Sequence, residues 1–228
     1  MTGPSSKAGR AGTASPAKRL VIAVDGPAAA GKGTLAQALA QFLGLPYLDT
    51  GLFYRATARL ALDAGAPLEE AVRFAEQLEG ADLVRPDLRT PDVDQAASFV
   101  ARQPKVRAAL LQRQRDFAAA TGAVLDGRDI GTVVLPDADV KFFVTASPEE
   151  RARRRYRQRH GCNPQETATL AAEVEAIKQR DSQDENRATA PLRPAVDAHH
   201  IMTDGLDAAG VLKVVVAHLE KRGLLDPT

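Results

Sequence analysis

The sequence predicts an α/β fold in which helices cover both faces of a parallel sheet. Short apolar runs rich in β-branched residues alternate with longer stretches of helical periodicity, an order that favours parallel strands joined by crossover helices. The chain of 228 residues is long enough for one such core and too short for two full-sized domains. Ligands of these sheets bind beyond the carboxyl ends of the strands, where functional residues are therefore expected.

The N-terminal half begins with a strand, a loop and a helix. Residues 19–26, RLVIAVDG, form a short apolar run that predicts the first strand. Residues 34–44, TLAQALAQFLG, have apolar side chains at helical spacing and end at a glycine, which predicts the first helix. A second short strand is expected in residues 45–51 and a second helix in residues 53–64.

The remaining elements are expected on the same grounds. Residues 68–83 continue a helical pattern, which the prolines of residues 85–92 interrupt. Residues 93–120 predict further helical structure, divided into two helices at Pro104. Three more strands are expected, in residues 122–129, 139–146 and 197–205.

The segment GPAAAGKGT, residues 26–34, joins the first strand to the first helix. Its first two glycines, Lys32 and Thr34 fit the spacing of a phosphate-binding loop, or P-loop, although Gly33 stands where the common pattern has a hydroxyl. Glycines let backbone N–H groups converge on phosphate oxygens, and the following helix adds its positive N-terminal end. Lys32 is expected to bridge the β and γ phosphates, and Thr34 to be the partner of Mg²⁺.

This loop makes the predicted fold P-loop NTPase-like and a nucleoside triphosphate the expected ligand. The residues expected to bind ATP in the loop are Gly26, Pro27, Ala28, Ala29, Ala30, Gly31, Lys32, Gly33 and Thr34. A strand-to-helix turn with incidental glycines is the alternative. Because motors, switches, transporters and kinases share this loop, the second substrate must decide the function.

A dense run of arginines occupies residues 151–159, where six of nine residues are arginine. Three interpretations are open: a mobile lid that closes over ATP, a solvated basic face, and a nucleic-acid patch. The lid, about residues 151–165, is favoured because like charges without acids between them repel one another on an ordinary surface helix. Within it, Arg153 and Arg157 are expected to contact ATP.

Composition narrows the setting in which the protein works. The net charge is +1 and aromatic residues make up 4% of the chain, which gives no electrostatic footprint for nucleic acid or an anionic membrane and few stacking platforms. The single cysteine, Cys162, cannot form an intramolecular disulfide, and no apolar run approaches the roughly 18 residues that span a bilayer. We expect a cytoplasmic monomer without nucleic-acid or membrane partners.

The first 18 residues differ from the rest and are expected to form a disordered tail, with residues 19–228 as one domain. They mix Gly, Ser, Ala and Pro with three cations and have no apolar centre, which argues against a secretory signal. A transit peptide is the alternative, because the tail contains Ser and Arg and no acid, but it has no evident amphipathic helix.

The sequence also contains the motifs IAVDGPAAAGKGTLA, YLDTGLFYR, QAASFVA, DGRDIGTVVLPDADVKFFVTAS and RDSQDENRATAPLRPAVDA. Together they resemble the bacterial cytidylate kinases, a group of nucleoside monophosphate kinases, over about residues 20–220. The resemblance implies transfer of the γ-phosphoryl group of ATP to CMP or dCMP in pyrimidine metabolism, with Mg²⁺ and without a covalent intermediate. The GKGT form of the loop is itself similar to that family, which accounts for Gly33.

The resemblance further implies an acceptor site built from a monophosphate-binding region of about residues 50–107 and from later segments. The residues expected at the acceptor phosphate, the cytosine and the sugar are, in that order, Thr50, Arg55 and Arg128; Ser98, Arg107 and Asp129; and Arg180 and Asp184. The residues expected to act in catalysis are Lys32, Arg128 and Arg187, the last on the phosphates during transfer.

The cytosine assignment has a chemical basis. Cytosine offers an amino donor beside two acceptors, so Asp129 can accept from N4 while Arg107 donates to N3 and O2. Uracil has a carbonyl in place of the amine, and a buried group left unpaired costs about 1–3 kcal/mol. Arg180, Asp184 and Arg187 would share one face if their segment were helical; an ion-pair network at a helix end is the alternative interpretation of these three residues.

Several features are left open. Residues 80–90 are shorter than the insert that the family commonly carries, which bears on the preference among CMP, dCMP and UMP. Asp25 and Asp126 could each hold water around Mg²⁺ or cap a turn, and His199 and His200 are expected to be structural. A P-loop switch module and a kinase for a non-nucleotide acceptor are the rival functions.

Overall fold

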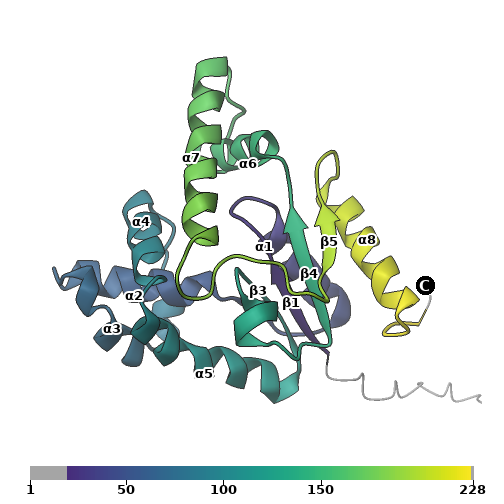
Figure 1. Ribbon diagram of the computed structural model, residues 1–228, viewed down its shortest axis with the longest axis horizontal. Coiled ribbons are helices and arrows are strands. Elements are labelled where there is room, and N and C mark those ends of the chain that lie inside the picture. The colour runs from purple at the N-terminus through teal and green to yellow at the C-terminus, as the bar shows by residue number, and fades with distance from the viewer. Residues whose placement is uncertain (1–19, 227–228) are drawn as a thin grey trace, which may run out of the picture.

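The computed structural model describes residues 20–226 and contains a parallel sheet with strand order β2-β3-β1-β4-β5 (Figure 1). The strands are β1 (Val21–Asp25), β2 (Tyr47–Asp49), β3 (Ala123–Gly127), β4 (Val140–Thr145) and β5 (His199–Met202). Each lies where the sequence predicts a strand, which confirms the α/β fold. The expected disordered tail, residues 1–18, lies outside the described residues.

Helices connect the strands. The α-helices of residues 20–226 are α1 (Lys32–Leu43), α2 (Gly51–Asp63), α3 (Val72–Glu76), α4 (Pro91–Val100), α5 (Pro104–Thr121), α6 (Pro148–His160), α7 (Thr167–Glu185) and α8 (Ala208–Lys221). Pro104 occupies the first turn of α5, where its missing N–H costs nothing, so the predicted division at this residue is confirmed. Within the same residues no helix is long and apolar enough to cross a membrane.

Helices cover both faces of the sheet because side chains along β1 alternate in direction. Ile22 and Val24 are buried with residues of α1 and α8 on one face, and Ala23 is buried on the other with Ala118 of α5 and with Ile130 of the short π-helix η3 (Ile130–Val134). A separate core joins α2, α3, α4 and part of α5. Figure 1 shows α2, α3 and α4 to one side of the sheet, which is where the sequence predicts a monophosphate-binding region.

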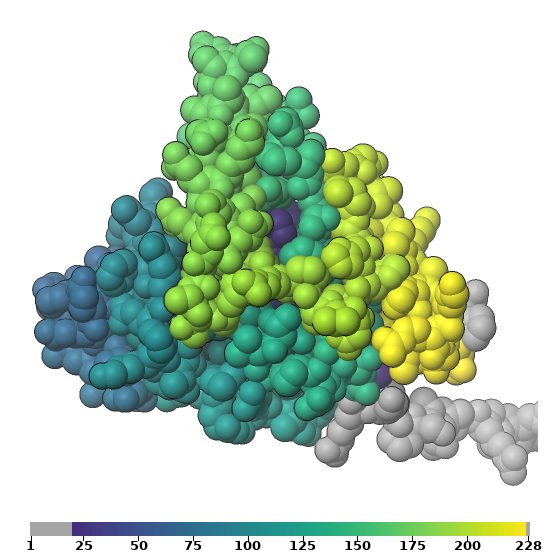
Figure 2. Space-filling view, in the orientation of Figure 1, coloured from purple at the N-terminus to yellow at the C-terminus, as the bar shows by residue number. Residues whose placement is uncertain are grey.

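The carboxyl ends of the central strands meet at one edge. Asp25, the last residue of β1, is in register with Gly127 of β3 and Phe143 of β4, and Asp49 of β2 is in register with Asp126. In Figure 1 the arrow of β4 points toward α6 and α7, which stand at this end. Figure 2 shows the surface hollowed there, with a small purple area of the N-terminal part visible between the green α7 and its teal neighbours.

The helical pattern of residues 68–83 is broken into short pieces, so the continuous helix predicted there is wrong. The structure has a 3-10 helix η1 (Leu68–Glu70), then α3, then a second 3-10 helix η2 (Gly80–Val84). Glu79 caps η2, and the Asp82 side chain accepts from the Glu79 backbone N–H at 2.8 Å. This capping box starts a new helix where the periodicity alone predicts a continuation.

The short segment 80–90 contains no strand and is fastened to α2 by ion pairs. Arg85 contacts Asp63 at 2.8 Å and Asp87 at 2.6 Å, while Arg59 contacts Asp63 at 2.6 Å and Asp92 at 3.3 Å. Isolated surface pairs contribute little, but shared partners form a network that limits the movement of each side chain. Ion pairs therefore hold this short segment against α2 in the region where the sequence predicts monophosphate binding.

The histidines of β5 lie at the edge of the sheet and have different neighbours. The ring of His199 stacks on that of His218 from α8, with centroids 3.9 Å apart, and Phe142 packs edge-on against both. His200 is exposed and its ring lies 5.6 Å from that of Phe143. The pKa of His218 is lowered, mainly by burial and to a smaller extent by the positive charges of His199, Arg222 and Lys221.

The stacked histidines should make stability depend on pH. Because the pKa of His218 is lower in the folded state, the unfolded chain binds the proton first, and stability is lost as pH falls through the ordinary value of about 6.5. His218→Gln removes this titration and should lose less unfolding free energy than the wild type between about pH 7.5 and 5.5. Urea unfolding at both pH values measures the difference. His200→Gln is the control, and parallel profiles of wild type and His218→Gln would contradict the prediction.

Candidate active site

The loop between β1 and α1 has a tight backbone in which two glycines occupy positions that other residues rarely adopt. Gly26 has φ 149°, and a Cβ there would lie 2.0 Å from the carbonyl oxygen of Val144 in β4. Gly31 has φ 90° and immediately precedes Lys32, the first residue of α1. Ala29 also has a positive φ, of 60°. The loop is thus pressed against the sheet, and the positive end of α1 faces the place where it turns, the geometry that binds phosphate.

Lys32 lies at this turn, close enough to both acids and arginines for their charges to act on it. Its Nζ is 3.5 Å from the carbonyl oxygen of Pro27. Burial and then Arg128 lower the pKa of Lys32 to about 8, while Asp126 and Asp49 oppose the shift. Burial likewise raises the pKa of Asp126 to about 6, and Lys32 opposes that shift. An added phosphate would favour the charged ammonium and lift the pKa of Lys32.

The position of Asp126 explains why residue 33 is a glycine and not the serine or threonine of the common loop pattern. A Cβ at Gly33 would lie 2.9 Å from Oδ2 of Asp126, so a serine or threonine at this position would collide with the carboxylate. The hydroxyl therefore comes one residue later, on the exposed Thr34 in the first turn of α1. The departure from the common loop pattern follows from a tertiary contact 93 residues away along the chain.

The two acids with open roles differ in their surroundings. Both carboxylate oxygens of Asp25 accept backbone hydrogen bonds, from Ile130 at 2.8 Å and from Gly131 at 2.7 Å. Burial raises the pKa of Asp25 to about 6, and these two bonds oppose the shift. Asp126 accepts from the Tyr47 hydroxyl at 3.2 Å and faces the loop. The structure therefore favours the capping role for Asp25, whereas Asp126 lies beside the phosphate-binding loop.

The residues expected at the acceptor phosphate come from α2 and the end of β3. The hydroxyl of Thr50 donates to the carbonyl oxygen of Asp126 at 2.7 Å. Arg55 donates from Nη1 to the carbonyl oxygen of Leu88 at 3.1 Å and pairs with Asp94 of α4. The residues predicted to bind the acceptor phosphate and the loop predicted to bind the triphosphate therefore meet at Asp126.

The residues expected to read cytosine form a buried group. Arg107 of α5 pairs with Asp129, and both side chains are less than 10% exposed. The guanidinium of Arg107 also lies over the ring of Tyr54, 5.6 Å from its centroid. Burial raises the pKa of Asp129, and Arg107, Arg187 and Arg128 oppose that shift. The hydroxyl of Ser98 donates to the backbone of its own helix, at the carbonyl oxygen of Asp94, 3.0 Å away.

The end of α7 supplies a second group. Asp184 accepts from Nε of Arg128 at 3.0 Å. Arg180 shares the helix with Asp184, but Arg187 lies beyond the helix end at Asn186 and turns back, so that its Nε donates to the backbone oxygen of Asp184 at 3.2 Å. The expectation of one shared helix face therefore holds for Arg180 and Asp184 only.

This group has more cationic donors than the protein satisfies. Burial and then Arg128 lower the pKa of Arg180 to about 10. Within residues 20–226, Nε of Arg180 and one terminal nitrogen of Arg187 are buried without a hydrogen-bond partner. Unpaired buried donors are costly, and an anionic ligand between these arginines would satisfy them.

Helix α6 carries the arginine run but presents it in two directions. Arg153 and Arg157, expected to contact ATP, are exposed, and Arg157 donates to Asn163 at 2.8 Å. The structure does not bring these two to the loop. Arg151 and Arg154 instead donate to the loop carbonyl oxygens of Ala28 and Ala30, each at 3.3 Å.

Sequence reasoning missed Arg151 and Arg154 as loop contacts. Arg151 is buried and paired with both oxygens of Asp181 in α7, and Arg154 donates to the Thr203 hydroxyl at 2.8 Å. Their partners lie 30 and 49 residues away. Nothing in the local spacing of the run distinguishes them from their neighbours.

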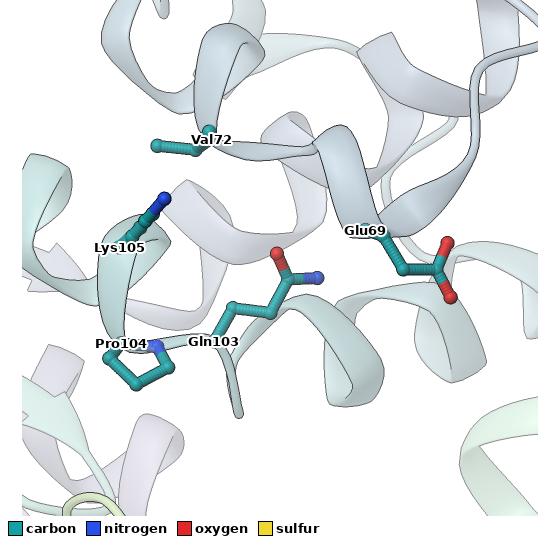
Figure 3. Close-up of a pocket in the computed structure, with 5 residues that line it drawn as sticks. All are labelled: Glu69, Val72, Gln103, Pro104 and Lys105. Carbon is teal, nitrogen blue, oxygen red and sulfur yellow. The ribbon is translucent and has the colours of Figure 1, made fainter.

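A further surface hollow lies within the predicted monophosphate-binding region and is separate from these residues. It measures about 350 Å³ and is lined by Glu69, Val72, Gln103, Pro104 and Lys105 (Figure 3). The carboxamide of Gln103 donates to the backbone oxygen of Leu68 at 2.7 Å, which closes the hollow on one side. None of its lining residues is among those expected to bind nucleotide.

The fold and the site together define a P-loop phosphotransferase: a glycine loop at the carboxyl edge of a parallel sheet faces a cradle of arginines. A model of the family described as cytidylate kinase matches residues 22–221. The chain belongs to this family, which makes the protein a nucleoside monophosphate kinase that phosphorylates CMP to CDP at the expense of ATP.

Relatives cover most of the chain. It is 58% identical to a cytidylate kinase of Granulibacter bethesdensis, over 83% of this chain and 91% of the relative. A cytidylate kinase of Acidiphilium cryptum is 56% identical over 83% of this chain and 90% of its own length. Among solved structures, an uncharacterized protein from Eubacterium ventriosum has the same fold, with a TM-score of 0.50 at 12% identity over 89% of this chain and 99% of its own.

Removing the Lys32 charge should stop turnover while leaving the fold intact. Lys32→Met keeps the length of the aliphatic chain but loses the cation predicted to contact the triphosphate, so kcat should fall by about a thousandfold or more. Steady-state ADP production measures the loss, and thermal unfolding checks the fold. Lys178→Met, on the exposed side of α7, is the matched control and should keep wild-type turnover. A Lys32→Met variant with near-wild-type kcat would refute the role of the loop.

Proposed function

We propose that these residues carry out in-line transfer of the γ-phosphoryl group of ATP to CMP, with dCMP as a second acceptor. The observation that carries the proposal is the double contact of Asp126. Its side chain lies against the triphosphate loop at Gly33, while its backbone oxygen holds Thr50 of the acceptor region. Two phosphates bound on either side would face each other across one residue, which is what transfer without a covalent intermediate requires.

On the ATP side, backbone N–H groups of the loop would cradle the phosphates and Lys32 would bridge β and γ. Lys32 starts α1, so its ammonium and the helix end act on the same oxygens. Arg153 and Arg157 stay in the proposal as residues that would reach ATP if α6 moved as a lid, since both are exposed in this structure.

On the acceptor side, Thr50, Arg55 and Arg128 would hold the CMP phosphate. Arginine suits this role because its planar fork binds phosphate through two parallel hydrogen bonds and stays charged. The Arg128 guanidinium already lies near Lys32, whose pKa it lowers. A phosphate between these two cations would relieve their repulsion, so binding of the acceptor and placement next to ATP are favoured together.

Cytosine would lie against Asp129, Arg107 and Ser98, and the sugar against Arg180 and Asp184. The buried pair of Arg107 and Asp129 offers a donor and an acceptor side by side, which matches N3 and N4 of cytosine. The pair also orients each side chain before the base arrives, because neither can turn away without leaving a buried charge unpaired.

Mg²⁺ fits the residues near the loop. Thr34 offers an exposed hydroxyl, and the Asp126 carboxylate stands next to Gly33. Residues 20–226 hold no group of three acidic, histidine or cysteine side chains that could form a cage, and Mg²⁺ typically takes one or two protein ligands together with waters and phosphate oxygens. When bound, the ion would neutralise charge on the β and γ phosphates.

During transfer, an oxygen of the CMP phosphate attacks the γ phosphorus as the bond to the β-bridging oxygen breaks, giving CDP and ADP. This reaction needs charge neutralisation more than a base, and Lys32, Arg128 and Arg187 would supply it. Arg187 has a terminal nitrogen that is buried and unpartnered within the described residues, so it is available to donate.

We further propose that the enzyme works as a cytoplasmic monomer, without nucleic-acid or membrane partners.

The acceptor panel separates this proposal from the rival functions. ADP release from ATP should be stimulated at least tenfold by CMP and by dCMP, more weakly by UMP, and negligibly by AMP or by no acceptor, because only cytosine satisfies both members of the buried pair. Coupled detection of ADP with each monophosphate tests this. Equal ADP release with and without CMP would instead indicate a slow hydrolase of the switch type.

Asp129→Ala tests the reading of cytosine. The variant removes the carboxylate partner of Arg107, which keeps its hydrogen bond to the backbone oxygen of Ala101, and leaves the cytosine amine without an acceptor. CMP affinity should therefore fall by about 5- to 150-fold, the equivalent of about 1–3 kcal/mol. ATP affinity should change little. Calorimetric titration of each nucleotide measures both. Asp137→Ala, a change of the same charge outside the site, serves as control; unchanged CMP affinity in Asp129→Ala would show that this residue does not read the base.

A further inference from the structure

Asp94, in the first turns of α4, is the meeting point of two arginines from different parts of the chain. Its Oδ1 pairs with Nη1 of Arg55 from α2, and its Oδ2 lies 3.4 Å from Nη2 of Arg155 in α6. The contact between Asp94 and Arg155 joins residues 61 positions apart. All three side chains are between 18% and 25% exposed, so the contacts are partly shielded from water.

Arg55 is held by one of its nitrogens only. Nη1 donates both to the Asp94 carboxylate and to the carbonyl oxygen of Leu88. Nε and Nη2 make no hydrogen bond to residues 20–226. A guanidinium fixed at one terminal nitrogen presents its opposite edge in a defined direction, which is the arrangement that lets arginine bind a phosphate through two hydrogen bonds.

Arg155 depends on the same carboxylate. Burial first, then Arg159, lowers the pKa of Arg155, while Asp94 and Glu173 oppose the shift. Asp94 also acts on Arg180, where it opposes the lowering of the pKa caused by burial and by Arg128. Asp94 is thus the acid that a cluster of arginines shares on the α4 side of the cleft.

We propose that Asp94 is a positioning residue for the acceptor: it orients Arg55 toward the CMP phosphate and couples that arginine to the lid helix α6 through Arg155. The inference rests on the proposed role of Arg55. In this structure Arg155 and Arg55 share the carboxylate, which holds both guanidinium groups in position. Loss of the negative charge releases both arginines at once, and the acceptor phosphate must then order them itself.

The test compares steady-state KM for CMP and for ATP in four proteins. Asp94→Asn keeps the shape of the side chain and removes its charge, and it should raise KM for CMP by about tenfold with KM for ATP within about twofold of wild type. Asp94→Glu restores the charge and should recover part of the loss. Asp116→Asn is the control: it removes the same charge from an exposed position of α5, where the side chain accepts from Gln112, so its KM for CMP should equal that of wild type.

A double substitution tests the coupling. Asp94 is proposed to act through Arg155 as well as Arg55. The double variant Asp94→Asn/Arg155→Gln should therefore raise KM for CMP by a smaller factor than the product of the factors measured for the two single variants. Thermal unfolding checks each variant. Asp94→Ala, whose side chain has the highest helix propensity, carries the same test if the Asn variant does not fold.

The outcomes are distinct. A KM for CMP in Asp94→Asn within about twofold of the wild-type value would overturn the inference. A KM below the wild-type value would also overturn it, because Asp94 would then compete with the phosphate for Arg55. Wild-type protein without CMP-dependent turnover would overturn the proposed function and this inference with it. An active wild type with an unchanged variant would overturn the inference alone.

Discussion

The arrangement of this protein depends on the end of β3, at Asp126. The carboxylate fills the space beside Gly33 and the backbone oxygen accepts from both the N–H and the hydroxyl of Thr50. Register with Asp49 places the start of α2 at the same point. Because parallel strands end at one edge, the loop that suits a triphosphate and the helix that suits a monophosphate are held side by side by a single residue.

Several arginines lie around this junction, and each is paired with an aspartate. Arg107 is paired with Asp129, Arg128 with Asp184, and Arg55 with Asp94. Burying an ion pair costs desolvation, and breaking one costs more, so each arginine is held in one orientation before any nucleotide enters. The donors left over are those that a phosphate would satisfy. Preorganisation of this kind lowers the reorganisation needed at the moment of transfer.

Helix α6 shows how one basic segment can be divided between structure and function. Arg151 and Arg154 anchor it to the loop carbonyls, while Arg153 and Arg157 face solvent. Helical geometry turns adjacent residues about 100° apart, so alternate arginines of a dense run necessarily have different surroundings. The anchored side chains tie the position of the helix to the loop, and the exposed ones are available for a ligand.

The sequence by itself determined the five strands, the helices α1, α2, α4 and α5, the phosphate-binding loop and the division at Pro104, because each depends on spacing within a few residues. The nucleotide-site motifs identified the family for the same reason. Tertiary structure decided what depends on distant partners: why a side chain at residue 33 would have to displace the Asp126 carboxylate, and which arginines of α6 touch the loop. It also decided the short helical pieces of residues 68–83 and the sharing of Asp94 by two arginines. Local patterns carry no information about such contacts, since the partners approach only when the chain has folded.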